Sequence, residues 1–277
     1  MAIFRKYGGS ILGQLDGKLK QKLSVDLDLF LMHFVHVFMF IHFAPTEFQM
    51  PLLFGYSSSH FNKNTRPLLK IIGEIIDEID FNDRLDPMNH PADVPWMWDF
   101  HMGTADTFPI FTRCPQDPVR RGCLIQPKYK APVWKCHIVR NFLGIIIHFY
   151  GVCCGSTSDK SIWRKVRRDM RGMGMRDREL YVCDGIYYGE RNTTAKRPRT
   201  ADQPYTASEL EKHMDLNHVR LQIEHGVSLF NGFHNLFHMA ARCDDETLFY
   251  CARLTAHATN VLIKYRIEQN GPAYDII

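Results

Sequence analysis

The order of predicted elements from residue 96 onward restricts the fold of this chain more than any other feature of its sequence. Strand-like runs come first, in "WMWDFHMGTADTFPIF", "GCLIQP" and "WKCHIVRNFLGIIIHFYGVCCG", the last of which is long enough for two strands. A helix over "SDKSIWRKVRRDM" follows, with Ser156 or Ser158 as its cap, and "LYVC" is the next strand. The runs "ASELEKHM", "LNHVRLQIEHGVSLFNGFHNLF" and 246–267 are predicted helices. This order predicts an α/β domain with a mixed sheet and flanking helices over residues 95–277.

Ahead of this domain the sequence is helical in pattern. Residues 1–23 are polar, glycine-rich and basic, and we expect a flexible or weakly helical lead-in. Residues 24–80 predict a small all-α unit with helices over 27–43, 47–54 and a longer third helix, separated by a Gly-Ser turn. The layout is typical of a helix-turn-helix, and a plain helical bundle fits it nearly as well. Residues 81–94 are rich in Pro, Asp and Asn and predict a linker.

One segment of the helical unit is apolar enough to raise the question of a membrane. "LDLFLMHFVHVFMFIHFAP" carries His33, His36 and His42 and is short for a spanning helix. We therefore predict a buried amphipathic helix and expect no membrane partner.

The charge of the chain is concentrated in two places. The 277 residues include 45% hydrophobic residues and carry a formal net charge of +4, which by itself does not indicate nucleic acid. "RKVRRDMRGMGMRDR" and "KRPR" are strongly basic and suit a phosphate backbone, whereas the alternative is a solvated helix face. The predicted DNA-binding residues are Arg164, Lys165, Arg167, Arg168, Arg171, Lys196, Arg197 and Arg199.

The eight cysteines have no spacing typical of a metal site. A zinc site assembled from distant Cys and His residues is left open as a different kind of metalloenzyme. The sequence shows no secretory signal, so we expect reduced thiols inside a cell.

One acidic residue ends a buried run. In "ELYVCDGIYYGE", Asp184 follows a predicted strand and precedes Gly185, which suits either a turn or a metal ligand held at a strand end. Asp106 in "GTADTF" and Glu224 on a downstream helix are the other two candidates. In a ribonuclease-H-like sheet the first and fourth strands are neighbours and a later helix packs beside them. That topology would bring the three carboxylates to one edge.

Such a cluster suits phosphodiester chemistry. Two Mg²⁺ ions about 3.5–4 Å apart stabilise the attacking and leaving oxygens, and Mg²⁺ prefers carboxylate ligands. Mn²⁺ would serve in the same place. Three like charges packed together are costly without a metal, so the cluster itself argues for one.

The words around these acids resemble a known family. "GTADTFPIF", "GSTSDKSIW", "LYVCDGIYYG" and "NHVRLQIEHGVSLFNGF" are similar to the ordered motifs of Harbinger-type DDE transposases and the nucleases derived from them, over about residues 96–237. The resemblance implies a ribonuclease-H-like fold, a preceding helix-turn-helix, and metal-dependent cleavage and transfer of DNA strands. It implies Asp106, Asp184 and Glu224 as catalytic metal ligands, with Asp159 supporting the site or capping a helix.

The resemblance also implies a place in the cell and partners. We expect a nuclear protein that acts on double-stranded DNA, with a separate Myb-like DNA-binding protein and further copies of this chain as candidate partners.

Several positions depart from the family pattern. Thr107 follows Asp106 where the family has Asp-Gly-Thr or a near variant, and Ser158 stands where a His usually precedes the acid. Phe230 and Asn231 occupy the region of an expected basic residue. These departures favour an alternative, a catalytically silent DNA-binding or scaffold protein, whereas retention of all three acids favours the enzyme.

Two further features have more than one interpretation. Arg220 lies four residues before Glu224 and on the same helix face, so it could orient the carboxylate, contact phosphate, or form a structural ion pair. Trp96 and Trp98 could stack on bases or belong to the core.

Overall fold

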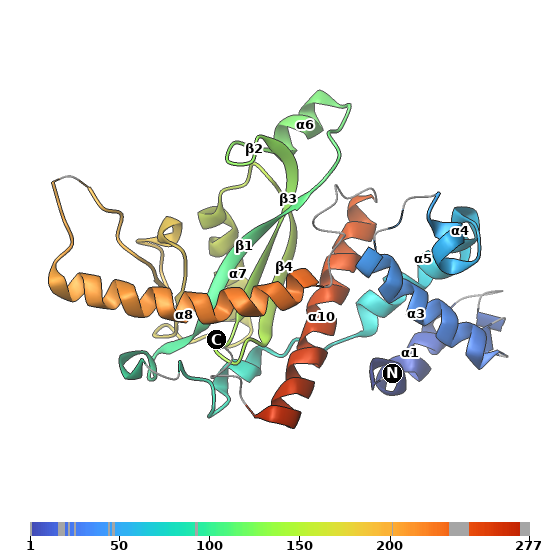
Figure 1. The fold of residues 1–277 in the computed structure, drawn as a ribbon, viewed down its shortest axis with the longest axis horizontal. Coiled ribbons are helices and arrows are strands. Elements are labelled where there is room, and N and C mark those ends of the chain that lie inside the picture. Colours follow the sequence, from blue (N-terminus) through green and yellow to red (C-terminus); the bar gives the residue numbers. More distant parts are fainter. Residues whose placement is uncertain are drawn as a thin grey trace.

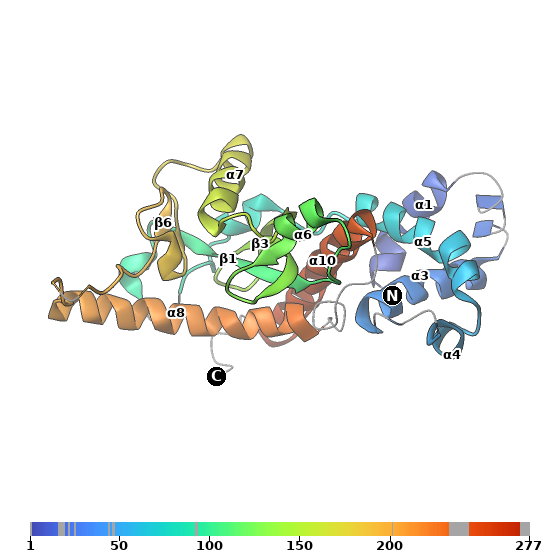
Figure 2. The same ribbon diagram turned by 90° about the horizontal axis from the view of Figure 1, so that it is seen from above.

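The fold has a helical unit at one end and a helix-flanked sheet beside it (Figure 1). The structure, a computed structural model, describes residues 2–15, 20–21, 23–24, 26–43, 45, 48–91, 94–200, 202–232 and 244–271, and within 221–232 the helical backbone alone. Seen from above, α7 (Asp159–Gly172) covers one face of the sheet, and α8 (Ala207–Gly232) and α10 (Asp245–Asn270) lie on the other (Figure 2).

The sheet is mixed. Its strands are β1 (His101–Phe111), β2 (Ile125–Gln126), β3 (Ala131–Arg140), β4 (Ile146–Cys154), β5 (Leu180–Val182) and β6 (Thr193–Thr194). The order along the sheet is β2-β3-β1-β5-β6, with β4 also paired to β3. The β1–β3 and β3–β4 pairs are antiparallel, and the β1–β5 and β5–β6 pairs are parallel. The predicted α/β class and mixed sheet with flanking helices are confirmed.

A glycine allows the two longest strands to approach closely. Gly103 has φ 153°, and a Cβ at this position would lie 1.8 Å from the carbonyl oxygen of Arg140. Any side chain would therefore force β1 and β3 apart at this point. The register between β1 and β5 also shifts here, which sets how the following residues of β1 align with β5.

The helix α7 forms where the sequence predicts it. The Ser158 side chain accepts a hydrogen bond from the Ser161 N–H and so caps the helix, as expected. The buried side chains recur at helical spacing and face the sheet. They are Ile162, Trp163, Val166 and Met170.

Two predicted boundaries after residue 110 are wrong. The first half of the run "GCLIQP" is helical, because Asp117 caps α6 (Pro118–Leu124) and Pro118 takes its first position, leaving only the two residues of β2 as strand. The two helices predicted over 207–237 form one continuous helix, α8, as far as Gly232. Short 3₁₀ turns complete the chain at η1 (Phe81–Leu85), η2 (Pro95–Met97) and η3 (Gly185–Tyr187).

The N-terminal unit contains α1 (Ala2–Gln14), α3 (Leu27–Phe43), α4 (Met50–Phe54) and α5 (Ser58–Ile75). Gly55, with φ 73°, ends α4, and Ser57 caps α5, as the Gly-Ser turn predicts. The α5 helix runs through Pro67 without interruption. Thr46, the predicted cap of the second helix, lies outside the described residues. Among the described residues, no helix combines the length and the apolar character needed to cross a membrane.

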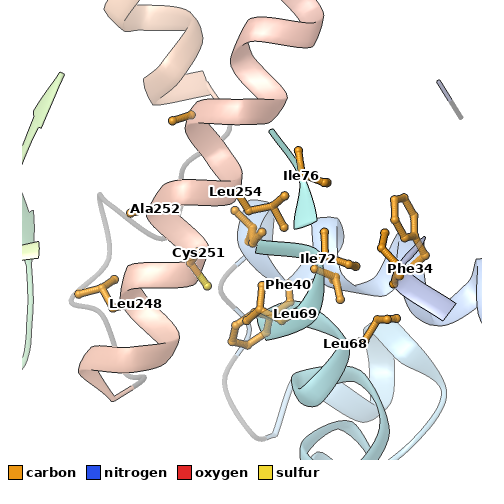
Figure 3. Close-up of a cluster of buried hydrophobic side chains, with 14 of the residues drawn as sticks. Phe34, Phe40, Leu68, Leu69, Ile72, Ile76, Leu248, Cys251, Ala252 and Leu254 are labelled. Atoms are coloured by element: carbon orange, nitrogen blue, oxygen red, sulfur yellow. The ribbon is translucent and has the colours of Figure 1, made fainter. Parts of the chain in front are cut away.

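The helical unit shares one core with the C-terminal helix. Leu248 and Leu254 of α10 pack in the same cluster as Leu69 and Ile72 of α5 (Figure 3). Ile138 of β3 belongs to this cluster as well, so it reaches from the helices to the sheet. Burying each such side chain contributes roughly 1.5–3 kcal/mol, and these contacts hold the two parts of the chain together.

The segment predicted as a linker is fixed to the sheet. Arg84 in η1 donates to both carboxylate oxygens of Glu179, at 2.9 and 3.3 Å, and to the carbonyl of Gly174 at 3.0 Å. The side chains of Arg84 and Glu179 are only 2% and 1% exposed. The amide of Asn89 bonds the carbonyls of Arg84 and Met102. This connection positions the start of β5 relative to β1.

Candidate acidic site at the ends of two parallel strands

The sheet brings Asp106 and Asp184 to the same edge. In the parallel pairing of β1 with β5, Thr104 is aligned with Val182. Asp106 and Asp184 each follow two residues later, Asp106 within β1 and Asp184 just after β5. Because the two strands are parallel and in this register, the two acids are neighbours, and both are exposed to solvent. The surrounding protein raises the pKa of Asp106 by reducing its hydration, and the charge of Asp184 adds to that shift.

Both carboxylates are held by their local backbone. Asp106 Oδ1 accepts from the N–H of Thr107 at 2.8 Å, and Asp184 Oδ1 accepts from the N–H of Gly185 at 2.7 Å. Asp184 also serves as the N-cap of η3, so it has the turn role that the Asp-Gly dipeptide predicts. That role does not bury the carboxylate, whose side chain stays 54% exposed.

Arg220 connects α8 to this pair of acids. Its Nη1 donates to Asp184 Oδ1 at 3.3 Å, and its charge acts on Asp106 as well. The helix is held in place by Leu216 and Val219, which pack with Val182 of β5. Thr206 and Glu209 form a capping box at its start, each accepting from the backbone N–H of the other. These contacts present Arg220 to the acidic edge of the sheet.

The other two predicted acids have different positions. Glu224 lies on α8 one turn after Arg220, and its side chain is outside the described part of the chain. Asp159 is the first residue of α7, and its Oδ1 accepts from Lys135 Nζ at 2.9 Å. Lys135 also donates to the carbonyl of Thr157. Asp159 therefore ties the start of α7 to β3, while Ser158 supplies the cap.

A buried arginine that the sequence did not suggest lies behind Asp106. Arg140 is 3% exposed and is aligned with Thr104 across the β1–β3 pair, which puts it on the same face as Asp106. Burial lowers the pKa of Arg140 to about 10, and the charge of Asp106 opposes that shift. In the sequence, Arg140 is simply an arginine within the run predicted to form two strands, and nothing there indicated its place beside Asp106.

The pKa of Asp106 reflects a crowded site that water can still reach. The surrounding protein reduces its hydration and raises the pKa above the ordinary value, against the bond from Thr107 and the charges of Arg140 and Arg220. Asp106 is nevertheless exposed to solvent, so an ion could reach its carboxylate. The site thus combines two accessible acids with two arginines.

Thr107 and Tyr187 support the site from the opposite face of the sheet. Their hydroxyl groups are 2.8 Å apart, and Tyr187 is buried against Trp163 of α7. Tyr187, three residues after Asp184, therefore joins β1, η3 and α7 on the sheet face opposite the two acids. Thr107, which departs from the family pattern, is the residue that makes this contact.

The predicted basic residues of α7 lie on the helix that covers the sheet face opposite α8 (Figure 2). Arg164 forms a two-pronged ion pair with Glu190, and Arg171 pairs with Asp177. Lys165 and Arg168 are exposed, and Arg167 is half-buried. Some of this basic charge is therefore already paired within the protein.

The second basic cluster lies closer to the acids. Lys196 is half-buried, and the charges of Arg220 and Asp184 both act on it. Arg197 pairs with Glu209 and donates to the carbonyls of Gln203 and Pro204, whereas Arg199 is exposed. Lys196 is thus the predicted DNA-binding residue that the fold brings to the candidate site.

The remaining candidates from the sequence have structural contacts. Trp96 donates its indole N–H to Asp215 of α8, and Trp98 donates to the carbonyl of Pro91. Both tryptophans are partly exposed, at 43% and 46%. Within the described residues, no three His, Cys, Asp or Glu side chains are grouped so that they could hold a metal ion.

Comparison with known proteins does not assign the chain to a class. No family model matches it, and no match was found among curated proteins or solved structures. A functional assignment therefore depends on the site and on the motifs in the sequence.

Proposed function

We propose that this protein is a metal-dependent DNA endonuclease or transposase, or a derivative of one, with its active site at the acidic edge formed by β1, β5 and α8. The observation that carries the proposal is the juxtaposition of Asp106 within β1 and Asp184 just after the parallel strand β5, with Arg220 of α8 bonded to Asp184. Glu224, one turn further along α8, is the third acid of the proposed site.

The sheet topology supports a ribonuclease-H-like fold for this site. Leaving out the two-residue strand β2, the order is β4-β3-β1-β5-β6, with three antiparallel strands followed by two parallel ones. In such a sheet the first strand neighbours the strand that follows the first crossover helix, as β1 neighbours β5. The resemblance of the motifs to Harbinger-type transposases leads to the same fold independently.

The donor groups fit a hard divalent cation such as Mg²⁺ or Mn²⁺. Carboxylate oxygens are the ligands these ions prefer, and solvent reaches both Asp106 and Asp184. The loss of hydration raises the pKa of Asp106, and a bound cation would offset this cost to the ionised carboxylate. Asp106, Asp184 and Glu224 would hold the ions, which would stabilise negative charge on the attacking and leaving oxygens of a phosphodiester.

The chain's own residues would bind and orient the DNA strand. Arg220 and Lys196 lie beside the acids and would contact phosphate oxygens. Arg140, buried behind Asp106, stabilises the ionised form of that carboxylate. Thr107 and Tyr187 fix the two strand ends relative to each other.

A second candidate function is a DNA-binding or scaffold protein without catalysis. The ion pair between Arg220 and Asp184 favours it, because a guanidinium already neutralises one of the proposed ligands. Asn231, in the region of an expected basic residue, favours it as well. In this alternative the acidic edge would be a structural element of the sheet.

A cleavage assay separates the two functions. We would incubate the protein with plasmid DNA and with oligonucleotide duplexes, with Mg²⁺ or Mn²⁺, alone and with a Myb-like partner. The proposal expects metal-dependent nicking that is lost in Asp106→Asn, Asp184→Asn and Glu224→Gln. The matched control, Asp177→Asn, changes an exposed acid that pairs with Arg171 away from the site and should cut like the parent. A parent that binds DNA without cutting it would favour the scaffold.

A further inference from the structure

A second region with unexplained chemistry lies at the other side of the sheet, along the outer strand β4. A pocket of about 360 Å³ is bounded by β4, by the segment that follows α5, and by α10. Its volume is at the small end of the range for pockets that bind small molecules. Its lining includes Asp77, Phe81, Phe149, Phe249, Arg253 and His257.

Two hydrogen-bond donors face each other in the wall of this pocket. His257 Nδ1 accepts the backbone N–H of Glu78 at 2.9 Å. Burial lowers the pKa of His257 to about 4, so the ring is neutral near pH 7 and its single proton is on Nε2. Arg253 Nε lies 3.4 Å from this Nε2. Because both atoms carry a hydrogen, neither can accept, and an oxygen placed beside the two would bond both.

Strand β4 forms the opposite wall of the pocket and includes His148. His148 on β4 is 5% exposed, and its Nδ1 has no hydrogen-bond partner among the described residues. The rest of the lining is largely aromatic, with Phe81, Phe149 and Phe249. The pocket therefore combines apolar and aromatic side chains with the hydrogen-bond donors of Arg253 and His257.

The charges around the pocket favour one negative charge in a ligand over two. Arg253 is the cation of the lining, and it forms no ion pair with any described residue. Asp77 brings an exposed carboxylate to the rim and would repel a second negative charge. A carboxylate suits this balance better than a phosphate dianion and forms a two-pronged bond with arginine.

We propose that this pocket binds a small aromatic carboxylate, whose oxygens accept from Arg253 and from His257 Nε2 while the ring packs among Phe81, Phe149 and Phe249. The site is separate from Asp106 and Asp184 and does not rest on the proposed nuclease function.

Calorimetric titration of the full chain with 2-naphthoate tests the proposal, and 2-naphthamide is the uncharged ligand control. We expect saturable binding of one 2-naphthoate per chain and at least tenfold weaker binding of the amide. Arg253→Gln should weaken 2-naphthoate binding at least tenfold. Arg266→Gln, an exposed arginine on the same helix, should leave it unchanged.

A second variant keeps the test valid if Arg253→Gln disturbs the fold. Met173 is 55% exposed at the rim of the pocket. Met173→Trp should fill the pocket and abolish binding while leaving the sequence of α10 unchanged. The proposal is overturned if 2-naphthoate does not bind saturably, if the amide binds equally well, or if folded Arg253→Gln and Met173→Trp both bind like the parent.

Discussion

Strand β5 has an acid paired with an arginine near each end, and the two pairs differ in almost every physical respect. Before the strand, Glu179 and Arg84 are 1% and 2% exposed and share a two-pronged bond. After the strand, Asp184 and Arg220 are 54% and 30% exposed and share a single contact at 3.3 Å. The first pair is inaccessible and fixes the strand. The second can exchange partners with solvent, an ion or DNA, as a functional site requires.

Breaking the buried pair should have the largest effect. Arg84→Ala leaves the Glu179 carboxylate buried without its cation and removes bonds to the carbonyls of Phe81 and Gly174. We expect the free energy of unfolding to fall by about 3–5 kcal/mol, measured by urea denaturation. The double variant Arg84→Met/Glu179→Leu should recover most of this loss, because no unpaired charge stays buried. A loss below about 1 kcal/mol in Arg84→Ala would contradict the structural role.

The equivalent change at the exposed pair should barely alter stability. Arg220→Gln removes an ion pair that water screens, so we expect a change of no more than about 1 kcal/mol in the free energy of unfolding. The same denaturation experiment measures it beside Arg84→Ala. A loss of unfolding free energy as large as that of Arg84→Ala would mean that the Asp184–Arg220 pair stabilises the fold as the buried pair does.

The basic residues close to the acidic edge should contribute more to DNA binding than those far from it. Lys196 lies beside the acids, so Lys196→Ala should lower the slope of log affinity against log salt by about 0.9 on duplex DNA. Arg171→Ala, whose side chain already pairs with Asp177, should change this slope less. Fluorescence anisotropy over a salt series gives both values. Equal slopes for both variants and the parent would mean that the two basic clusters are solvated surfaces and do not contact DNA.

The smallest expected effect is a pH-dependent gain at Asp106. Because the folded protein raises the pKa of this carboxyl group above 3.8, it binds the proton more tightly than the unfolded chain does. The ionised form therefore destabilises the fold above the raised pKa, and the penalty disappears as the pH falls through it. In EDTA, Asp106→Asn should raise Tm at pH 7 and lose that advantage near pH 4. An Asp106→Asn variant that is less stable than the parent at pH 7 would contradict this sign.

Much of the fold was predictable because its signals are local. The two apolar strands β3 and β4, and α7 with its Ser158 cap, follow from periodicity and capping over short stretches. The sequence "GCLIQP" misled because an apolar run resembles a strand, whereas the helix start at Asp117 and Pro118 lies just before it. The division of 207–237 into two helices was misleading because Asp215, a residue type that often caps a helix, lies inside the continuous helix α8.

Only the part of the candidate site whose position is set by the strand order could be predicted. Once the strand order and register are fixed, Asp106 and Asp184 must be neighbours, since each lies two residues after an aligned pair of the parallel strands β1 and β5. The roles of Arg140 and Arg84 could not be predicted, because their partners are set by tertiary packing. Arg84 and Glu179 are 95 positions apart in the chain. No local pattern records that contact.

Binding of Mn²⁺, followed by the loss of its free-ion signal in electron paramagnetic resonance, tests most directly whether the exposed end of β5 is a metal site. The parent should bind Mn²⁺ saturably, Mg²⁺ should compete, and Asp177→Asn should bind like the parent. The double variant Asp106→Asn/Asp184→Asn, folded by circular dichroism, should bind no Mn²⁺ in the same range. Undiminished binding in that variant, or no binding by the parent, would contradict the assignment of Asp106 and Asp184 as metal ligands.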